Sequence, residues 1–468
     1  MKYVSTRGRA PRLGFAEVLL AGLARDGGLY VPEKFPRLAR NELRALQGRA
    51  YAEIAARVMS PFVGGAIPRA AFERLVAETY AGFGHAAVAP LKQLGPDRWL
   101  MELFHGPTLA FKDYALQLVG RLFDHVLAKL GERVTIVGAT SGDTGAAAIE
   151  ACRDRERVEI FILHPRGRVS EVQRRQMTTV RSANVHNIAI EGTFDDCQDL
   201  VKAMFNDLAF RDRHRLAAVN SINWARIMAQ VPYYFAAGAS LGAPERALSF
   251  AVPTGNFGNV YAGYVARRMG LPIRRLIVGS NRNDILTRYL RRGVMATAKV
   301  VPTTSPSMDI QVSSNFERLL FEAWNRQSAP LAAAMEGFRR LGRADFGRER
   351  WRRIARLFAG FRLDDRGTAG AIRDIHRSCG ELLDPHSAIG VAAGEALHRP
   401  GDGALVALAT AHPAKFPDAV AAAAGVRPAL PARLADLFER PERCTTLVND
   451  LAGVKAFVTG RLNARARP

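Results

Sequence analysis

The sequence contains little cysteine and no long apolar run. Its 468 residues include 4 cysteines, Cys152, Cys197, Cys379 and Cys444, which show neither metal-ligand nor redox spacing. This argues against a disulfide framework and a cysteine metal site, and it favours a reducing cytoplasm. The longest apolar stretches, 404–411 and 419–424, are too short and too interrupted by charged residues to span a bilayer. Because residues 1–11 are polar and basic, we expect no secretory signal and a soluble cytoplasmic protein.

Acidic residues are also in deficit, since 44 Asp and Glu face 66 Lys and Arg and the formal charge is +22. This charge raises the hypothesis of a nucleic-acid partner, which the arginine runs 339–343 and 348–356 sharpen. The arginines are, however, spread over the chain among acids, without a helix-turn-helix, zinc-finger or RNA-recognition signature. We therefore expect solvated helix faces and no nucleic-acid or membrane partner, while a positive field would attract a doubly anionic small substrate.

Short β-branched runs alternate with helical stretches after about residue 90. Strands are expected at 135–137, 159–163, 185–190, 249–252, 276–278 and 405–408, and helices at 16–23, 51–59 and 195–205. This alternation predicts an α/β fold with doubly wound parallel sheets, preceded by a mainly helical N-terminal region. Loops that follow strands bind ligands in such sheets, which directs attention to the loops beginning at Thr140 and Pro253.

The segment His105–Asp113 places Lys112 beside apolar residues in a chain whose positive charge is mostly arginine. An amine flanked by Ala110 and Phe111 is a candidate for desolvation, which disfavours the ammonium and leaves a nucleophile. Such an amine forms Schiff bases with carbonyl cofactors. The alternative is an ordinary lysine at a helix start, and this segment alone favours that alternative.

Two strand-loop-helix junctions support the first interpretation. The loops Thr140–Gly145 and Thr254–Asn259 each lead from a β-branched run into a helix. Unpaired N–H groups and the helix dipole at such a junction suit an anionic group. Asp143 stands where an N-cap would be, so capping and ligand binding both remain open for it. The second loop lacks the Walker ending and the paired-glycine dinucleotide fingerprint, which argues against nucleoside triphosphates and nicotinamide cofactors.

Together these segments resemble threonine synthase, a family of pyridoxal-phosphate enzymes with the tryptophan-synthase-β-like fold, fold type II. The resemblance runs to near residue 420, and it includes residues 1–8 and 23–32, which look like the family's N-terminal domain. It implies an N-terminal domain at 1–90, a small α/β domain at 91–235 with the Schiff-base lysine, and a large α/β domain at 236–468 with the cofactor-phosphate loop.

The resemblance also implies roles for individual residues. Pyridoxal 5'-phosphate would be bound by Lys112, Thr254, Gly255, Asn256, Phe257, Gly258, Asn259 and Thr410. The substrate would be bound by Thr140, Ser141, Asp143, Thr144, Asn220, Ser221 and Arg226. Within these sets, Thr410 would face the pyridine nitrogen, although a strand-end hydroxyl bonded to backbone is nearly as good an interpretation. Asn220, Ser221 and Arg226 would grip the substrate phosphate.

The implied reaction converts O-phospho-L-homoserine and water to L-threonine and phosphate by γ-elimination and β-addition, the last step of threonine biosynthesis. Lys112 would act as the catalytic base at Cα. A leaving phosphate carries about two negative charges, which makes the forked guanidinium of Arg226 its natural partner. The alternative is a pyridoxal-phosphate lyase that acts on O-phosphothreonine or O-phosphoserine with the same lysine and loops. No metal is implied, and we expect a monomer or homodimer.

Three residues depart from the family's usual pattern without removing a catalytic group. Asn259 stands where many relatives have aspartate, Trp224 where many have proline, and Tyr114 where phenylalanine or a small residue is usual. Two further segments have weaker signals. Residues 313–315 are expected to cap a helix rather than contact a ligand. The segment 384–389 resembles a family segment close to the cofactor, and His386 within it is assigned no role.

Overall fold

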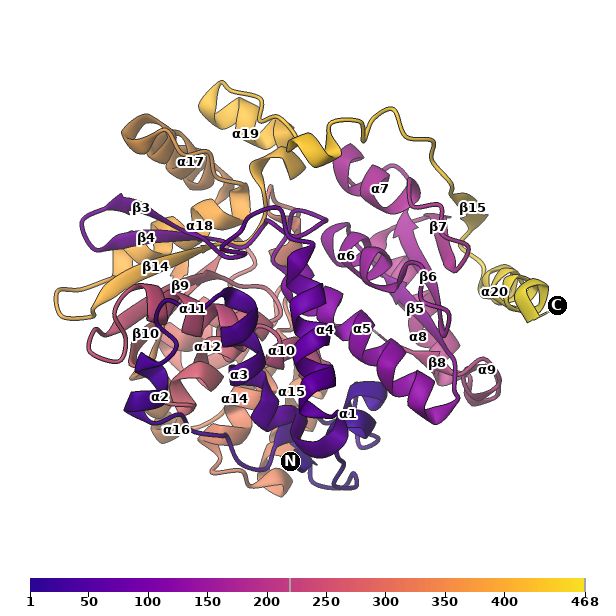
Figure 1. Cartoon of the computed structure of the whole chain (residues 1–468), viewed down its shortest axis with the longest axis horizontal. Coiled ribbons are helices and arrows are strands. Elements are labelled where there is room, and N and C mark those ends of the chain that lie inside the picture. Colours follow the sequence, from indigo (N-terminus) through magenta and orange to yellow (C-terminus); the bar gives the residue numbers. More distant parts are fainter. Residues whose placement is uncertain (219, 467–468) are drawn as a thin grey trace. The chain divides into compact units, whose positions relative to one another are not determined.

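The computed structural model describes residues 1–218 and 220–466, which form two compact units (Figure 1). Unit 1 comprises Met1–Ala115 and Ser221–Pro428, and unit 2 comprises Leu116–Asn220 with the described residues from Ala429 onward. Each unit contains its own parallel sheet. The units cut across the three ranges expected from the sequence, because residues 221–428 pack with the N-terminal residues while the chain after residue 428 returns to unit 2.

The N-terminal region combines helices with a small antiparallel ladder. Its helices are α1 (Phe15–Ala21), α2 (Arg40–Arg44), α3 (Tyr51–Val63) and α4 (Arg69–Ala81). Strand β1 (Tyr3–Ser5) pairs antiparallel with β2 (Tyr30–Pro32). The expectation of a mainly helical region is corrected by this ladder. Strands of three residues are too short to show the alternation by which a strand is recognised in a sequence.

The sheet of unit 1 has six strands in the order β13-β10-β9-β14-β4-β3, and all neighbours are parallel except β3 and β4. The strands are β3 (Leu91–Gly95), β4 (Arg98–Glu102), β9 (Leu248–Pro253), β10 (Ile273–Ser280), β13 (Phe358–Arg362) and β14 (Ala404–Ala409). Successive side chains of a strand point to opposite faces. Ala251 packs in a cluster with Val391 of α18 (Pro385–Leu397), whereas the Phe250 ring lies 4.7 Å from that of Tyr234 on α11 (Val231–Ser240). Helices therefore cover both faces, as expected.

The other elements of unit 1 lie around this sheet. They are α10 (Trp224–Met228), α12 (Gly258–Arg268), α13 (Ile285–Arg292), β11 (Val294–Ala296), α14 (Phe316–Ala323), α15 (Ser328–Leu341), β12 (Arg343–Asp345), α16 (Arg348–Ala355), α17 (Asp365–Cys379) and α19 (Pro417–Ala424). Three short 3-10 helices at 64–66, 306–308 and 413–415 complete unit 1, and a fourth at 432–434 lies in unit 2.

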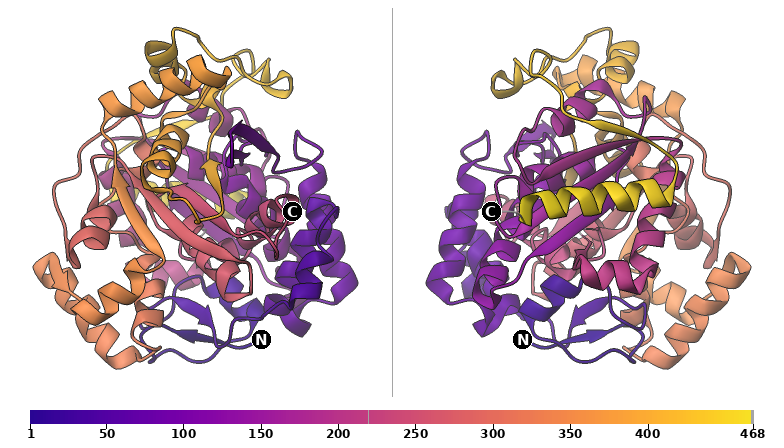
Figure 2. Two further views of the ribbon diagram at one scale, coloured as in Figure 1. Left: turned by 90° about the vertical axis from the view of Figure 1, so that its left-hand side faces the viewer. Right: turned by 90° about the vertical axis from the view of Figure 1, so that its right-hand side faces the viewer.

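The sheet of unit 2 is fully parallel and has the order β15-β7-β6-β5-β8. Its strands are β5 (Val134–Ala139), β6 (Val158–Pro165), β7 (Val185–Glu191), β8 (Leu216–Ala217) and β15 (Thr445–Val448). The accompanying helices are α6 (Asp143–Cys152), α7 (Glu171–Thr178), α8 (Phe194–Asn206), α9 (Leu208–Arg213) and α20 (Leu451–Ala466), while α5 (Lys112–Leu130) begins in unit 1. Leu200 of α8 and Val454 of α20 join one buried cluster with Phe161, and Figure 2 shows α20 lying along these strands. The segment after residue 428 thus completes the core of unit 2.

All six strands expected from the sequence are confirmed, whereas β1, β2, β3, β4, β8, β11, β12, β13 and β15 were not expected. Strand β4 begins with Arg98 and ends with Glu102, so its apolar part is only three residues long. Strand β13 contains Gly360, a residue that is unfavourable in strands. These strands form through pairing with longer neighbours rather than from a signal of their own.

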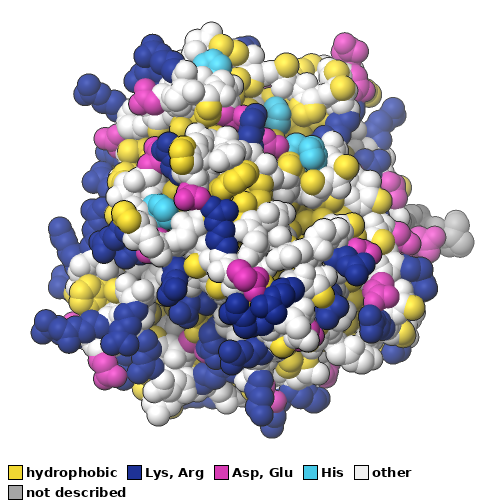
Figure 3. Space-filling model, turned by 60° about the vertical axis from the view of Figure 1, so that its left-hand side comes forward, with side chains coloured by type: hydrophobic (Ala, Val, Ile, Leu, Met, Phe, Trp, Pro, Cys, Tyr) yellow, Lys and Arg dark blue, Asp and Glu magenta, His cyan; other side chains and the backbone are white. Residues whose placement is uncertain are grey.

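Basic and acidic side chains are interspersed on the face shown in Figure 3. Ion pairs join several of them at the surface, among them Arg69 with Glu73 and Arg440 with Asp436. Within the described ranges no helix combines the length and the apolar character needed to cross a membrane. In the same residues no group of three or more His, Cys, Asp or Glu is arranged to hold a metal ion.

Candidate active site

Lys112 begins α5, and its side chain is only 9% exposed. The turn before it is clamped to the residues that follow β14. The Phe111 N–H donates to the Thr410 carbonyl at 2.8 Å, and the His412 N–H donates to the Leu109 carbonyl at 3.0 Å. Because β14 is a central parallel strand, Lys112 and Thr410 lie at the carboxyl edge of the sheet, where such folds bind ligands.

Buried polar groups fix the backbone of this turn. The Asp113 carboxylate accepts hydrogen bonds from the Thr108 N–H at 2.8 Å and from the Thr108 hydroxyl at 2.7 Å. The fully buried Lys415 donates to the Thr108 carbonyl at 2.6 Å. A Cβ at Gly106 would lie 2.3 Å from that of Asp113, so only glycine fits there. Lys112 therefore extends from a rigid turn.

The loop Thr254–Asn259 connects β9 to α12 and presents the N-terminus of an 11-residue helix. Such a terminus carries unpaired N–H groups and a partial positive charge, which suit a phosphate. The Thr254 hydroxyl donates to the Val252 carbonyl at 2.7 Å, and Phe257 adopts a left-handed conformation with φ of 62°. At Gly255 a Cβ would approach the Ser307 carbonyl oxygen to 2.6 Å, so the segment around Ser307 packs directly on this loop.

Ser313 and Asn315 hold this loop, and Asn315 occupies the N-cap position of α14, at the helix start expected from the sequence. The Ser313 hydroxyl donates to the Gly255 carbonyl at 2.7 Å. The Asn315 amide donates to the carbonyls of Asn256 and Ser221, both at 3.0 Å, and it makes no capping bond to α14. These contacts connect the expected cofactor-phosphate loop to the segment expected to bind the substrate phosphate.

Asn259 has a donor that points to no protein partner. Its side-chain oxygen accepts hydrogen bonds from the hydroxyls of Tyr233 at 2.6 Å and Tyr234 at 2.9 Å. Its buried Nδ2 has no partner among the residues that the structure describes. An aspartate here would have no N–H to offer, so the departure at this position supplies a donor at the start of α12.

Arg226 lies on α10 and is only 5% exposed. Neither its Nε nor its Nη1 has a hydrogen-bond partner in the described part of the chain. Burial lowers the pKa of Arg226 to about 10, which leaves the guanidinium charged at neutral pH. A buried cation without a partner is costly, and an anionic ligand would remove that cost.

The expected substrate loop of unit 2 is built around Thr140. The Thr140 hydroxyl oxygen accepts from the N–H groups of Gly142 at 3.0 Å and Gly145 at 2.8 Å. Gly142, with φ of 138°, is the N-cap of α6, and Asp143 is instead the first helical residue. Its carboxylate accepts from the Gln173 amide at 2.8 Å. Asp143 is therefore held by a neighbouring helix and does not cap its own.

The structure gathers most, but not all, of the expected residues into one unit. Unit 1 holds the expected cofactor-binding residues and part of the substrate-phosphate set: Lys112, Ser221, Arg226, Thr254, Gly255, Asn256, Phe257, Gly258, Asn259 and Thr410. Unit 2 holds Thr140, Ser141, Asp143, Thr144 and Asn220.

Sequence reasoning assigned no role to Ser307 or to His386, although both lie near Lys112 in the structure. The Lys112 Nζ donates to the Ser307 hydroxyl oxygen at 3.5 Å, and the Ser307 N–H donates to His386 Nε2 at 3.3 Å. The only signal for Ser307 is the density of serine and proline near it. His386 follows Asp384 and Pro385, an N-cap followed by proline, which indicates no more than a helix start.

Tyr114 and Trp224 are accommodated in the core of unit 1. The Tyr114 hydroxyl donates to the Val88 carbonyl, and its ring lies 4.8 Å from that of Phe83. The Trp224 ring lies 5.6 Å from that of Phe62. Both side chains are fully buried, so these departures alter packing rather than the donor set described above.

The residues of unit 1 fit pyridoxal phosphate. A buried amine suits its aldehyde, and a glycine-containing helix N-terminus suits its phosphate. The unpaired amide nitrogen of Asn259 adds a donor at the same helix start. Thr410 offers a hydroxyl next to the turn that carries Lys112.

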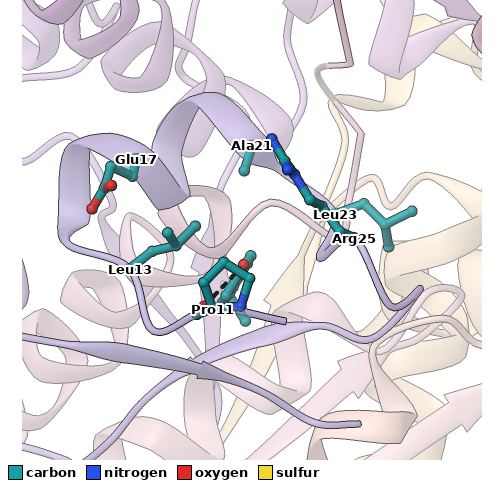
Figure 4. Close-up of a pocket in the computed structure, with 7 residues that line it drawn as sticks. Pro11, Leu13, Glu17, Ala21, Leu23 and Arg25 are labelled. Carbon is teal, nitrogen blue, oxygen red and sulfur yellow. Dashed lines mark hydrogen bonds between the residues drawn. The ribbon is translucent and has the colours of Figure 1, made fainter. Parts of the chain in front are cut away.

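A separate hollow in the N-terminal region is lined by other residues (Figure 4). It is lined by Pro11, Leu13, Glu17, Ala21, Leu23, Arg25 and Tyr30. The Tyr30 hydroxyl donates to the Pro11 carbonyl across it at 3.4 Å. None of the expected cofactor or substrate residues lines this hollow.

Three family profiles match the chain. "Threonine synthase N terminus" matches residues 2–80, "Pyridoxal-phosphate dependent enzyme" matches residues 84–346, and "Threonine synthase, C-terminal" matches residues 387–458. The second profile alone covers more than half of the chain.

Individual relatives agree over the full length. Threonine synthase from Pseudomonas aeruginosa is 58% identical, with 100% of each chain covered. A crystal structure of pyridoxal-phosphate-bound threonine synthase from Brucella melitensis superposes with a TM-score of 0.97 at 57% identity, covering 98% of this chain and 99% of that one. Threonine synthase from Escherichia coli gives a TM-score of 0.82 at 32% identity, covering 98% and 100%. The chain therefore belongs to the threonine synthase family of pyridoxal-phosphate-dependent enzymes.

Proposed function

We propose that the chain converts O-phospho-L-homoserine and water to L-threonine and inorganic phosphate with pyridoxal phosphate as its cofactor. The observation that carries this proposal is the buried Arg226 guanidinium, whose Nε and Nη1 have no hydrogen-bond partner among the described residues. It lies in the segment expected to bind the substrate phosphate. A phosphate with about two negative charges would satisfy both donors through charge-assisted hydrogen bonds.

Lys112, Thr410 and the loop Thr254–Asn259 would hold the cofactor. Lys112 would bind its aldehyde carbon, the N–H groups of the loop its phosphate, and Thr410 its pyridine nitrogen. When bound, the cofactor supplies an electron sink that makes carbon-bound protons of the substrate easier to remove.

Lys112 would act as the base in this reaction. Its amine, once free, takes the proton from Cα of the substrate and later returns a proton to carbon. The low exposure of Lys112 limits the access of water to the amine. The fixed turn of residues 105–113 limits the directions in which the amine can point.

Arg226 would bind the phosphate of the substrate and then the released phosphate, with Ser221 and Asn220 as further donors. Thr140, Ser141, Asp143 and Thr144 would bind the rest of the substrate. In this set the hydroxyls and the N–H groups of α6 are the donors for an anion, and the Asp143 carboxylate is engaged by Gln173. We further propose that the enzyme works in the cytoplasm as a monomer or homodimer.

The test is an assay of the purified protein with O-phosphohomoserine. We expect a visible absorption band from lysine-bound cofactor and equal release of phosphate and threonine. Lys112→Ala should abolish both. Lys129→Ala, an exposed lysine on the same helix, is the matched control and should change neither.

Two outcomes would contradict the proposal. Phosphate release from O-phosphothreonine or O-phosphoserine without threonine formation would assign the chain to the lyase alternative. A protein that stays colourless and inactive with added pyridoxal phosphate would disprove the cofactor assignment.

A further inference from the structure

A chain of buried polar groups in unit 1 ends at Lys112. The Asp384 carboxylate accepts from His386 Nδ1 at 2.7 Å, His386 Nε2 accepts from the Ser307 N–H at 3.3 Å, and the Ser307 hydroxyl accepts from Lys112 Nζ at 3.5 Å. Asp384 is fully buried and His386 is 4% exposed. We call Asp384, His386 and Ser307 the lysine support. Sequence resemblance assigned no role to any of them.

The directions of these hydrogen bonds define one histidine tautomer. A carboxylate can only accept, so Nδ1 of His386 carries the proton that it donates to Asp384. A backbone N–H can only donate, so Nε2 of His386 must present its lone pair to Ser307. The two bonds are compatible only with a neutral ring protonated at Nδ1. Asp384 thereby fixes the ring in the form that binds the Ser307 backbone.

Both ends of the lysine support are anchored. Asp384 also accepts from the N–H groups of His386 at 2.9 Å and Ser387 at 3.1 Å, which caps α18. The Ser387 hydroxyl oxygen in turn accepts from the Thr410 N–H at 2.9 Å, and Thr410 binds the turn before Lys112. The His386 ring packs 4.9 Å from that of Phe416. Asp384 and His386 are therefore held in place within the lysine support.

Ser307 is held from the opposite side as well. Its carbonyl packs on Gly255, where an added Cβ would lie 2.6 Å from the oxygen. The segment before and after it is pinned by Asp309, whose carboxylate accepts from the Thr303 N–H at 2.9 Å and the Asn281 amide at 2.8 Å. Charged groups near His386 include Asp384, Asp309 and, through Ser307, Lys112. Ser307 thus touches both the lysine and the cofactor-phosphate loop.

We propose that Ser307, oriented by His386 and Asp384, is a positioning residue that aims the amine of Lys112. By accepting one N–H, the hydroxyl directs the remaining substituents and the lone pair of the nitrogen. A misplaced reacting group lowers rate strongly even when the chemistry is intact. The inference rests on the proposed function in one respect, since Lys112 must be the residue that holds the cofactor.

The test measures the cofactor-loaded protein without substrate. Its visible absorption is titrated with pH, and the midpoint reports protonation of the lysine-bound nitrogen. Ser307→Ala should move the midpoint to lower pH by about 0.5–1 unit, because the hydroxyl stabilises the protonated nitrogen by one hydrogen bond. Asp384→Asn should produce a similar shift, because an amide donor would reverse the His386 tautomer.

Rescue and control variants separate positioning from folding. His386→Phe should shift the midpoint, whereas His386→Gln should stay close to wild type because it keeps an acceptor near the position of Nε2. His398→Gln is the matched control, since that ring accepts no bond from Ser307 and instead contacts the Gly403 carbonyl at 2.8 Å. Ser378→Ala is the control for loss of a hydroxyl, because Ser378 only bonds the Ile375 carbonyl. Neither control should shift the midpoint.

Each outcome of these measurements supports or contradicts the inference. An unchanged midpoint in Ser307→Ala, with cofactor bound, would overturn the inference. Equal shifts in His386→Gln and His386→Phe would also overturn the role of the Nε2 acceptor. If the Asp384→Asn variant does not fold, the Ser307→Ala variant still tests the inference, because the Ser307 hydroxyl caps no helix. A loaded wild type that makes no threonine would disprove the proposed function alone, whereas a wild type that takes up no cofactor would overturn both.

Discussion

Two buried arginines of unit 1, Arg318 and Arg226, differ in whether their guanidinium nitrogens have hydrogen-bond partners among the described residues. Arg318 is fully buried, and its guanidinium donates to the carbonyls of Tyr30 at 3.0 Å and Ile222 at 2.5 Å. It also donates to the Asn315 side chain and lies 5.9 Å from the ring of Trp224. Arg226, which is 5% exposed, leaves Nε and Nη1 without partners among the described residues.

Burial lowers the pKa of both side chains to about 10, so desolvation does not distinguish them. The difference lies in the donors that remain unpaired. A buried donor without a partner destabilises the folded state, and such groups are rare unless they bind something. Arg318 therefore stabilises the fold, whereas Arg226 should lower the stability of the ligand-free protein, and under the proposed function the substrate would supply its partner.

The largest effect should come from Arg226→Met. We expect kcat/KM for O-phosphohomoserine to fall roughly 10³-fold, because two charge-assisted hydrogen bonds to phosphate are lost. The thermal midpoint of the cofactor-free variant should stay equal or rise, since an unpaired buried charge is removed. Steady-state kinetics and thermal unfolding measure the two effects. The exposed Arg292→Met is the control, and full activity in Arg226→Met would reject its role.

Arg318→Met should show the opposite pattern. Its removal leaves the carbonyls of Tyr30 and Ile222 without this donor, which should lower the free energy of unfolding by about 2–4 kcal/mol. At temperatures where the variant is folded, the affinity for phosphate should change little. Chemical unfolding compared with Arg226→Met measures the contrast, and similar stability changes in the two variants would refute the distinction.

The sequence predicted the strands next to the candidate site, but not the contacts that distinguish Arg226 from Arg318. The predominantly apolar segments of β5, β9 and β10 carry a local signal, and so do the glycine loops that follow β5 and β9. Arg226 could be named only through its resemblance to a family segment. That its donors are unpaired, whereas those of Arg318 are not, depends on carbonyls about 100 to 290 positions away.

The same limit applies to residues that act through others. Ser307 contacts Lys112 across 195 positions, and Asn315 joins two loops 59 and 94 positions away. Before an apolar-periodic segment, Ser313 and Asn315 have the composition of a helix cap, and Asn315 is indeed the N-cap residue of α14, although its side chain bonds other segments. Local sequence predicts which residues can cap a helix, and tertiary contacts decide whether they do.

A third prediction concerns phosphate itself, used as a probe. In the cofactor-loaded wild type, where the cofactor would already occupy loop 254–259 under the proposed function, phosphate at ten times its Kd should stabilise the protein by about 1.4 kcal/mol. Arg226→Met should lose this protection, whereas Arg318→Met should keep it from its lower baseline. Thermal unfolding in phosphate, compared with chloride at equal ionic strength, measures this stabilisation. Equal protection of Arg226→Met would place the phosphate site elsewhere.

The smallest expected effect concerns a buried anion, Asp309. Asp309 resembles Arg318, because its carboxylate accepts from the Asn281 and Asn283 amides at 2.8 and 2.9 Å and from both donors of Thr303. Burial raises the pKa of Asp309, and the hydrogen bonds that lower it offset this only in part. Even a well-partnered buried charge therefore retains some cost of desolvation.

The sign of the pH effect follows from this raised pKa. Because the folded pKa lies above the unfolded value, the ionised carboxylate lowers stability at neutral pH, and this penalty disappears as pH falls through the folded pKa and then the unfolded value. Asp309→Asn cannot titrate. The stability of wild type relative to this variant should therefore increase between pH 7 and pH 4.5, measured by thermal unfolding at both pH values. Asp374→Asn, at an exposed position, should show no such trend. A decrease in the stability of wild type relative to Asp309→Asn on acidification would mean that the hydrogen bonds to Asp309 outweigh its burial, and Asp309 would then be a charge that stabilises the fold without penalty.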